Sequence, residues 1–333
     1  MKIVIIKTSA LGDILHTSFI LQFIKSHIPN AHISWVIESR FAGILSNHKD
    51  IDELITINTK NKSIKNILKT IKDLRALKKQ NNYDIAIDFQ GLLKSAITSK
   101  ILCKNNNGYD KNSIREKVAS YLYKNSFDIA YHSNTIDRYR ELLNKSLNIN
   151  VSKEDVLAKK NSCFYSQEST NSIKPFLSDE KKNIIFIVGS TWESRIYPKE
   201  RFLNIAKNLE NTNILVPYGN TEEKKFGEYL QRNSHNVKVL PKLSLDKLKA
   251  IISSADLLIG NDTGPSYIAW ANNIPSITIF GPTPASRIYE SNIHKLIKSS
   301  SIVDHYNLNK NDFSINEISE DKIIKIAQEL LNQ

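Results

Sequence analysis

Four short segments of the chain combine glycine with charged or hydroxyl side chains that could bind or react with a ligand, and each segment follows an apolar run. The first, KTSALGD at residues 7–13, precedes a helical pattern and offers one carboxylate, on Asp13. A carboxylate beside a cleft could act as a general base, whereas at the start of a helix it could instead be an N-cap. The segment contains neither GxxxxGK(S/T) nor GxGxxG, so ATP hydrolysis and NAD binding lack their usual signatures.

The other three segments carry basic and hydroxyl groups that suit an anion. DFQGLLKS at residues 88–95 puts Lys94 in the first turn of a helix, where a cation opposes the helix dipole unless an anion is nearby. GSTWESRIYPK at residues 189–199 combines small hydroxyl residues with basic ones, which suits a phosphate group. GNDTGPS at residues 260–266 places Asp, Thr and Gly at a helix N-terminus, where backbone N–H groups bind anions.

Each of these three segments also has an explanation without a ligand. Lys94 could be a solvated surface lysine. Residues 189–199 could be a loop followed by a helix that has Pro198 in its first turn. Residues 260–266 could be the capped start of a helix, and GPTP at residues 281–284 adds a neighbouring turn.

The four segments lie in predicted parallel βα units, each directly after a strand. Apolar runs alternate with amphipathic helical patterns, which predicts strands at residues 2–6, 32–37, 54–57, 84–88, 183–188, 213–216, 237–240, 256–259 and 276–280. Seven of the ten glycines fall where a predicted strand meets the next element, namely Gly12, Gly91, Gly189, Gly219, Gly260, Gly264 and Gly281. Open α/β sheets bind ligands at the carboxyl ends of their strands. We therefore expect a binding cleft between two such edges.

The pattern divides the chain into two predicted domains. An N-terminal α/β domain is expected over residues 1–155, and a polar, unperiodic connection over residues 156–182. A second α/β domain is expected over residues 183–333, and it ends in a capped amphipathic helix at residues 319–331.

Composition limits the class of protein. The 333 residues include 46 Lys plus Arg against 34 Asp plus Glu, a net charge of +12, and 37 of those cations are Lys. This charge indicates a phosphate-rich partner (nucleic acid, a nucleotide or an anionic membrane) or a compositional bias. The sequence has no apolar run near the roughly 18 residues of a transmembrane helix, and no signal peptide is recognisable. Cys103 and Cys163 are isolated, which is typical of a cytoplasmic protein and argues against a structural zinc site.

Seven motifs together resemble the lipopolysaccharide heptosyltransferases of glycosyltransferase family 9, in order and spacing, over nearly the whole chain. They are KTSALGDILHT, DFQGLLKSA, RYRELL, VPYGNTEE, LPKLSL, NDTGPS and FGPTPA. The first two resemble heptosyltransferase I more than II. The resemblance implies an α/β protein of the GT-B fold, with two Rossmann-like parallel-sheet domains facing across a cleft. It also implies an inverting transfer of L-glycero-D-manno-heptose from ADP-heptose to the inner Kdo of Kdo-lipid A, without cofactor or metal.

The resemblance assigns roles to individual residues. Asp13 matches the catalytic base, which takes a proton from the acceptor hydroxyl; one such carboxylate suffices for an inverting displacement. The residues that match the donor site are Ser190, Thr191, Arg195, Glu223, Asp262, Thr263 and Gly264. The acceptor-site candidates are Lys7, Ser9, Gly12, Lys94, Arg115 and Arg138, with Arg140 as a further cation.

Three donor positions need comment. Arg195 stands where the family has a phosphate-binding lysine, and it keeps the charge with a different geometry. Tyr267 stands where the family has a histidine after DTG. Glu223 matches an acid near the ribose hydroxyls, although Glu222 beside it could take that role.

A basic helix is predicted at residues 62–79. Its apolar positions are Ile64, Ile67, Leu68, Ile71, Leu74 and Leu77, and its cations are Lys62, Lys65, Lys69, Lys72, Arg75, Lys78 and Lys79. Such a helix could lie on an anionic membrane surface or could simply cover the sheet. If the helix lies on a membrane, and because the acceptor implied by the resemblance is lipid-anchored, we expect the protein to be peripheral on the cytoplasmic face of the inner membrane.

Other functions remain open at the level of the residues. A related GT-B transferase with another donor or acceptor, such as a heptosyltransferase II, would share most of these motifs. A nucleic-acid-binding module would need a recognised motif or aromatics interleaved with the basic run at residues 60–79, and the sequence has neither, so we expect no nucleic-acid partner. A Rossmann oxidoreductase would need the missing GxGxxG.

Overall fold

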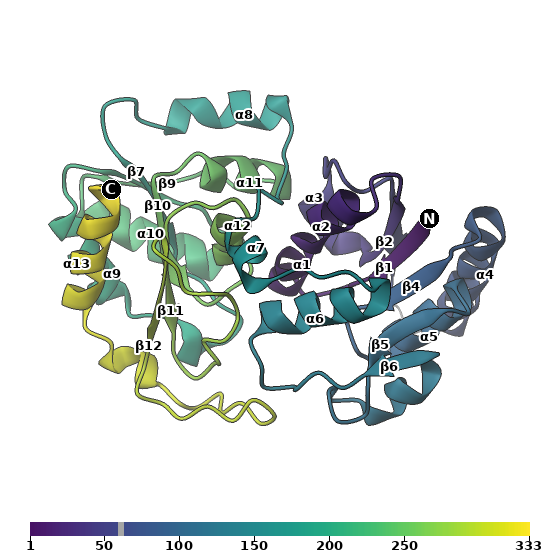
Figure 1. Cartoon of the computed structure of the whole chain (residues 1–333). Coiled ribbons are helices and arrows are strands. Elements are labelled where there is room, and N and C mark those ends of the chain that lie inside the picture. The colour runs from purple at the N-terminus through teal and green to yellow at the C-terminus, as the bar shows by residue number, and fades with distance from the viewer. Residues whose placement is uncertain (59–62) are drawn as a thin grey trace. The chain divides into compact units, whose positions relative to one another are not determined.

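The computed structural model describes residues 1–58 and 63–333, and these form two compact units, Met1–Ser162 and Cys163–Gln333 (Figure 1). The division falls inside the predicted connection at residues 156–182. That stretch has more structure than its polar sequence indicates, because it includes helix α8 (Gln167–Ile173) and follows closely on α7 (Lys153–Leu157). Ser152 and Ser166 cap these two helices, each accepting a hydrogen bond from a backbone N–H of the first turn.

The first unit is built on a parallel sheet of six strands, in the order β3-β2-β1-β4-β5-β6. The strands are β1 (Lys2–Ile6), β2 (His32–Glu38), β3 (Glu53–Ile57), β4 (Ile85–Asp88), β5 (Asn106–Tyr109) and β6 (Asn125–Phe127). The chain order reverses between β1 and β4, which makes their carboxyl ends the topological switch point of this sheet. The two loops that follow them are the predicted chemical segments at residues 7–13 and 88–95.

Helices cover both faces of this sheet. They are α1 (Leu11–Ser18), α2 (Ile20–His27), α3 (Ala42–Leu45), α4 (Ile64–Asn81), α5 (Leu93–Leu102), α6 (Thr135–Leu147) and α7, with 3₁₀ turns η1 (Ser39–Phe41) and η2 (Lys117–Leu122). Helix α4 packs against α5, and α5 against η2, whereas α6 packs against α1 and α2. The predicted helix at residues 62–79 corresponds to α4, and Lys62 lies outside the described residues.

The second unit repeats the design, with a parallel sheet in the order β12-β11-β10-β7-β8-β9. The strands are β7 (Asn183–Ile187), β8 (Asn213–Val216), β9 (Val237–Val239), β10 (Leu257–Asn261), β11 (Ser276–Phe280) and β12 (His294–Lys298). Its other elements are α8, α9 (Lys199–Asn208), α10 (Thr221–Asn233), α11 (Leu245–Ser253), α12 (Ser266–Ala271), α13 (Glu320–Leu331), η3 (Lys174–Phe176), η4 (Glu193–Arg195) and η5 (Ser314–Glu317).

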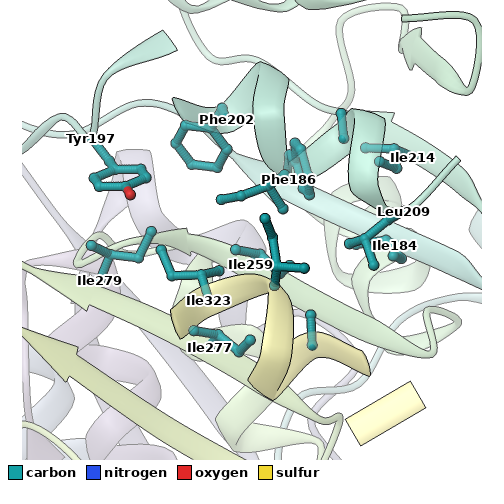
Figure 2. Close-up of a cluster of buried hydrophobic side chains, with 14 of the residues drawn as sticks. Ile184, Phe186, Tyr197, Phe202, Leu209, Ile214, Ile259, Ile277, Ile279 and Ile323 are labelled. Carbon is teal, nitrogen blue, oxygen red and sulfur yellow. The ribbon is translucent and has the colours of Figure 1, made fainter. Parts of the chain in front are cut away.

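One hydrophobic cluster ties the sheet of the second unit to its terminal helix. Phe186 of β7 and Ile259 of β10 are fully buried beside Phe202 of α9 and Ile323 of α13 (Figure 2). Ser319 caps α13, as the sequence predicts, and the helix packs on α9. The terminal helix therefore belongs to the second unit.

The nine predicted strands are all present, within two residues at their ends. Strands β5, β6 and β12 escaped prediction because their sequences, NNGY, NSF and HKLIK, lack an apolar run. Over the part of the chain that the structure describes, no helix is both long and apolar enough to span a bilayer.

Candidate active site

In the first unit, the loops after β1 and β4 meet at the switch point. The backbone N–H groups of Thr8 and Ser9 both donate to Oε1 of Gln90, each at 3.1 Å. Asp13 is half-buried as the third residue of α1, and its Oδ2 accepts a hydrogen bond from the Ala10 N–H at 3.3 Å. It is therefore not the N-cap residue, which is Ala10, because the helix begins at Leu11. A carboxylate in a first helical turn is stabilised by the helix dipole.

The loop after β4 is shaped by a buried carboxylate. Asp88 is fully buried, and its Oδ1 accepts from the backbone N–H groups of Gln90 at 2.8 Å and Gly91 at 3.2 Å. Its Oδ2 accepts from the Tyr123 hydroxyl at 2.8 Å. Burial raises the pKa of Asp88, against the effect of these hydrogen bonds. Gly91 has φ +67°, a conformation that favours glycine, so this tight turn presents Gln90 to the loop after β1.

The predicted acceptor cations separate into internal and exposed groups. Lys7 is only 3% exposed, and its Nζ donates to the Phe89 carbonyl at 3.1 Å and the Tyr139 hydroxyl at 2.9 Å. Burial lowers the pKa of Lys7, and the negative charge of Asp13 opposes that shift. The Lys7 ammonium is therefore buried between the loop after β4 and helix α6, and it is not presented at the surface.

Arg138 and Arg140 also have internal partners. The Arg138 guanidinium donates to three backbone carbonyls, those of Ile129, Ala130 and Ser113, at 3.1, 2.8 and 2.8 Å. Arg140 donates to the Val151 carbonyl and pairs with Asp137, both at 3.1 Å. These two side chains hold loops of the first unit together.

Lys94 and Arg115 are the exposed members of the predicted acceptor set. Lys94 lies in the first turn of α5, as expected, and Arg115 lies in the loop before η2. Ser9 and Gly12 are half-buried in the loop after β1. Lys94 and Arg115 are therefore exposed at the carboxyl edge of this sheet, whereas the Lys7 ammonium is buried and Arg138 is half-buried among backbone carbonyls.

In the second unit, the central feature of the site is the buried Asp262 carboxylate, directly after β10. Its Oδ2 binds Nη2 of Arg195 at 2.7 Å and accepts from the Thr283 hydroxyl at 2.7 Å. Its Oδ1 accepts from the Tyr267 hydroxyl. We call Asp262, Arg195, Tyr267 and Thr283 the Asp262 cluster. It joins the loops after β7, β10 and β11 at one sheet edge, and Thr283 is the member that the sequence analysis did not single out.

These contacts determine which groups of the Asp262 cluster are ionised. Burial alone would raise the pKa of Asp262, but the positive charges of Arg195 and Arg287 and the hydroxyl donors lower it overall. Burial and the adjacent carboxylate raise the pKa of Tyr267 well above its usual value. At neutral pH the cluster is therefore an ionised carboxylate held by a guanidinium and two neutral hydroxyl donors.

Three buried donors beside this cluster have no hydrogen-bond acceptor within the described residues. They are Nε1 of Trp192, Oγ of Ser194 and Nε of Arg195, all in or next to η4. The Arg195 guanidinium lies over the Trp192 ring, 4.7 Å from its centre. Buried donors without acceptors cost free energy unless a ligand supplies the acceptors. A ligand rich in oxygen acceptors, such as a diphosphate, fits this need.

The neighbouring predicted residues lie around the same edge. The Ser190 hydroxyl donates to the Asp262 carbonyl at 3.3 Å, and Thr191 is exposed. Thr263 and Gly264 form the turn before α12, which begins at Ser266. They therefore precede this helix and are not part of its first turn.

Glu223, not Glu222, lies at the carboxyl edge. Its Oε2 accepts from the Gly219 N–H at 2.6 Å, and its Oε1 accepts from Nδ2 of Asn220 at 2.8 Å. A Cβ at position 189 would overlap the Glu223 carboxylate, so glycine there allows the acid to approach the loop after β7. Glu222 faces solvent, where it pairs with Lys225 at 2.8 Å. The structure thus favours Glu223 as the donor-site acid.

Comparison with known proteins identifies the family. The model for glycosyltransferase family 9 (heptosyltransferase) matches residues 68–315, well over half of the chain. The chain belongs to glycosyltransferase family 9. It is 39% identical to lipopolysaccharide heptosyltransferase 1 of Campylobacter coli over 99% of each chain. It is also 30% identical to lipopolysaccharide heptosyltransferase 1 of Escherichia coli K12, covering 85% of this chain and 88% of that protein.

Solved structures confirm the predicted fold class of this glycosyltransferase. The E. coli heptosyltransferase WaaC with ADP matches with a TM-score of 0.80 at 25% identity, covering 99% of this chain and 100% of that one. The same enzyme with ADP-2-deoxy-2-fluoro heptose matches with a TM-score of 0.79. The two parallel six-stranded sheets are those of the GT-B fold.

The acidic and metal-ligating side chains of this glycosyltransferase are dispersed over the part of the chain that the structure describes. Within residues 1–58 and 63–333, no three His, Cys, Asp or Glu side chains gather in a way that could hold a metal ion. The donors grouped around Asp262 are instead guanidinium, hydroxyl and indole groups, which bind anions.

Proposed function

We propose that this protein transfers L-glycero-D-manno-heptose from ADP-heptose to the inner Kdo of Kdo-lipid A, as a heptosyltransferase I. The observation that carries this proposal is the 39% identity, over 99% of both chains, to a lipopolysaccharide heptosyltransferase 1. The match to WaaC bound to an ADP-heptose analogue supports the donor.

The second unit binds the donor in this proposal. The diphosphate accepts hydrogen bonds from Trp192, Ser194 and Arg195, whose donors lack acceptors within the protein part described. Ser190, Thr191, Thr263 and Gly264 line the same edge, and Glu223 binds the ribose hydroxyls. Asp262 holds the Arg195 guanidinium in place through its 2.7 Å ion pair, so the arginine is oriented before the donor arrives.

The first unit supplies the base. Asp13 takes the proton from the acceptor hydroxyl as that oxygen attacks the anomeric carbon from the face opposite the diphosphate, which leaves with the C–O bond electrons as ADP. The configuration inverts because a single displacement occurs, and the positive charge on Arg195 stabilises the developing diphosphate charge. In this proposal no metal ion or cofactor takes part, because the guanidinium and the N–H donors stabilise the leaving group.

The acceptor meets the first unit at the exposed cations. Lys94 and Arg115 bind its phosphates and carboxylates, while Ser9 and Gly12 border the reacting hydroxyl beside Asp13. Lipid A is anchored in a bilayer, so the protein works in the cytoplasm on the inner face of the inner membrane, as a peripheral protein. Nucleic acid is not a partner in this proposal.

The first test is mass spectrometry of Kdo-lipid A after incubation with the full chain and ADP-heptose in EDTA, with ADP release followed in parallel. One added heptose is expected, at a rate that EDTA does not change. Rates restored only by added magnesium would contradict metal independence, and addition only to an acceptor that already carries heptose would indicate a heptosyltransferase II instead.

A matched pair of variants tests the base. Asp13→Asn should keep ADP binding and lower the transfer rate by about 10²- to 10⁴-fold, the usual contribution of a general base. Asp155 is the control, since it is also the third residue of its helix, and its carboxylate accepts from the Ser152 N–H at 2.8 Å. If Asp13 only stabilises a helix start, Asp13→Asn and Asp155→Asn should both retain transfer.

A further inference from the structure

Large apolar side chains are exposed together on three elements of the first unit. On α4, Ile64, Ile67 and Leu68 are 76%, 46% and 62% exposed. On α5, Leu93 and Ile97 are 40% and 43% exposed, and on η2, Val118 and Tyr121 are 64% and 73% exposed. Soluble proteins rarely expose apolar side chains in groups unless the group binds a partner.

These three elements are neighbours on one face of the sheet. Helix α4 packs against α5, and α5 packs against η2 (Figure 1). The Leu93 N–H donates to the Glu116 carboxylate at 2.7 Å, which ties the start of α5 to the residue before η2. The seven exposed apolar side chains therefore lie on adjacent elements of one face of the first unit.

The position of this surface in the fold is defined by the direction of the strands. The three elements follow β3, β4 and β5, so their first residues lie at the carboxyl edge of the parallel sheet. Ile64 and Leu93 are the first residues of α4 and α5. The loop that carries Asp13 leaves β1 at the same edge. The apolar group thus borders the edge at which the base lies.

Helix α4 changes its surroundings along its length. Leu74 is 3% exposed and packs in the core of the sheet, whereas Ile64 and Leu68, earlier on the same apolar stripe, face solvent. The sequence left open whether this helix covers the sheet or lies on a membrane. The structure shows that its second half covers the sheet and that the apolar stripe continues beyond the core.

Cations accompany the exposed apolar side chains. Within residues 64–69, 93–97 and 115–121 there are five cations, Lys65, Lys69, Lys94, Arg115 and Lys117, and one acid, Glu116. All five cations are exposed. Apolar side chains flanked by Lys and Arg fit the boundary of an anionic bilayer, where the former enter the acyl region and the latter meet lipid phosphates.

We propose that these seven apolar and five basic residues, the α4–α5–η2 surface, dock the protein on an anionic lipid bilayer. A second copy of the chain fits less well, because pairing the surface with itself would bring five cations against five others. The inference rests on the proposed function in one respect: docking would hold the sheet edge that bears Asp13 close to a lipid-anchored acceptor. The docking itself requires neither donor nor acceptor.

Vesicle sedimentation of the full chain tests the docking directly. Vesicles of phosphatidylcholine alone are compared with vesicles that contain about one-third phosphatidylglycerol, both without Kdo-lipid A. We expect binding to the anionic vesicles that weakens as salt is raised. Ile97→Ser with Tyr121→Ser should lower the partition coefficient at least tenfold, and Lys65→Gln with Lys117→Gln by about tenfold or more.

Matched controls carry the same chemical changes elsewhere. Leu157→Ser with Phe313→Ser replaces side chains that are 48% and 44% exposed, and Lys322→Gln with Lys325→Gln removes two exposed lysines of α13. Both control pairs should bind vesicles as the unchanged protein does. Melting temperatures within about 2 °C would show that each variant is folded, since exposed side chains contribute little to stability.

Three results would overturn the docking proposal. They are equal binding to both kinds of vesicle, loss of binding in the control pairs as large as in the surface pairs, and a dimer in solution that Ile97→Ser with Tyr121→Ser dissociates while vesicles remain unbound. Transfer to a water-soluble Kdo acceptor is measured separately on the same proteins. That activity fails if the proposed function is wrong and persists if only the docking is wrong.

Discussion

The Tyr267 hydroxyl in the Asp262 cluster provides a prediction whose size follows from the structure. Tyr267 is 3% exposed, and its hydroxyl donates to the buried, ionised Asp262 carboxylate. Tyr267→Phe keeps the ring and removes this donor, so one carboxylate oxygen loses a partner in a site that water does not reach. Hydrogen bonds to buried charged groups contribute about 1.5–3 kcal/mol, and we expect a loss of that size in the free energy of unfolding.

Tyr197 is the matched control for this substitution. It is fully buried in the same unit, and its hydroxyl donates to the neutral Ile318 carbonyl at 2.8 Å. Arg201 donates to the same carbonyl, also at 2.8 Å, so Tyr197→Phe leaves that oxygen with a partner. A neutral hydrogen bond contributes about 0.5–1.5 kcal/mol, and the expected loss is therefore smaller than for Tyr267→Phe.

The pH dependence of the free energy of unfolding distinguishes a hydrogen bond to a charged group from a packing effect. The pKa of Asp262 is lowered in the folded state, so the stability that its contacts provide is present above the unfolded value of 3.8 and is lost as pH falls through the folded pKa. Without the hydroxyl, the folded pKa is lowered less. The difference in unfolding free energy between the unchanged protein and Tyr267→Phe should be constant above pH 5 and shrink only below pH 3.8, as pH falls through the folded pKa of Asp262.

Urea denaturation of the full chain, followed by circular dichroism at pH 7, 5 and 3.5, measures these differences. ADP affinity, measured by calorimetry on the same proteins, reports whether Arg195 is still oriented. A loss for Tyr267→Phe no larger than that for Tyr197→Phe at pH 7 would contradict a charged hydrogen bond at this position.

Two further predictions concern Gly189 and Lys159. Gly189→Ala places a Cβ against the Glu223 carboxylate, so ADP should bind at least several-fold more weakly by calorimetry while the melting temperature changes little; unchanged affinity would remove Glu223 from the donor site. Burial lowers the pKa of Lys159 to about 7, so the unfolded chain binds more protons between pH 7 and about 10, and stability rises with pH across that window. Lys159→Met should therefore stabilise the protein at pH 6 by more than at pH 9 in urea titrations, and an equal effect at both would show that this lysine is not desolvated.

The sequence predicts the architecture well where strands are apolar. Runs such as residues 2–6 and 276–280 identify buried parallel strands, because burial on both faces requires an uninterrupted apolar sequence. The edge strands β6 and β12 have solvent on one side and carry polar residues, and β5 reads NNGY, so no local pattern marked them. Their pairing depends on neighbours that are distant in the sequence.

The sequence also identified most of the loops that form the candidate site. Glycine, hydroxyl and charged residues after apolar runs indicate the carboxyl edge of a parallel sheet. This pattern predicts the loops after β1 and β4 in the first unit and those after β7 and β10 in the second. What each side chain does there was less predictable. Lys7 and Arg138 have the same charge as Lys94 and Arg115, yet the fold buries the first against Phe89 and commits the second to three backbone carbonyls.

The class of fold, the family and the sheet edges that carry the candidate site follow from the sequence, because local patterns and motif order specify them. Contacts between distant residues depend on the fold: Asp262 meets Arg195 from 67 residues away because β7 and β10 are neighbours in the sheet. Exposure was decided in the same way. Ile64 and Leu74 belong to one apolar stripe, but only Leu74 packs in the core of the sheet, while Ile64 is 76% exposed.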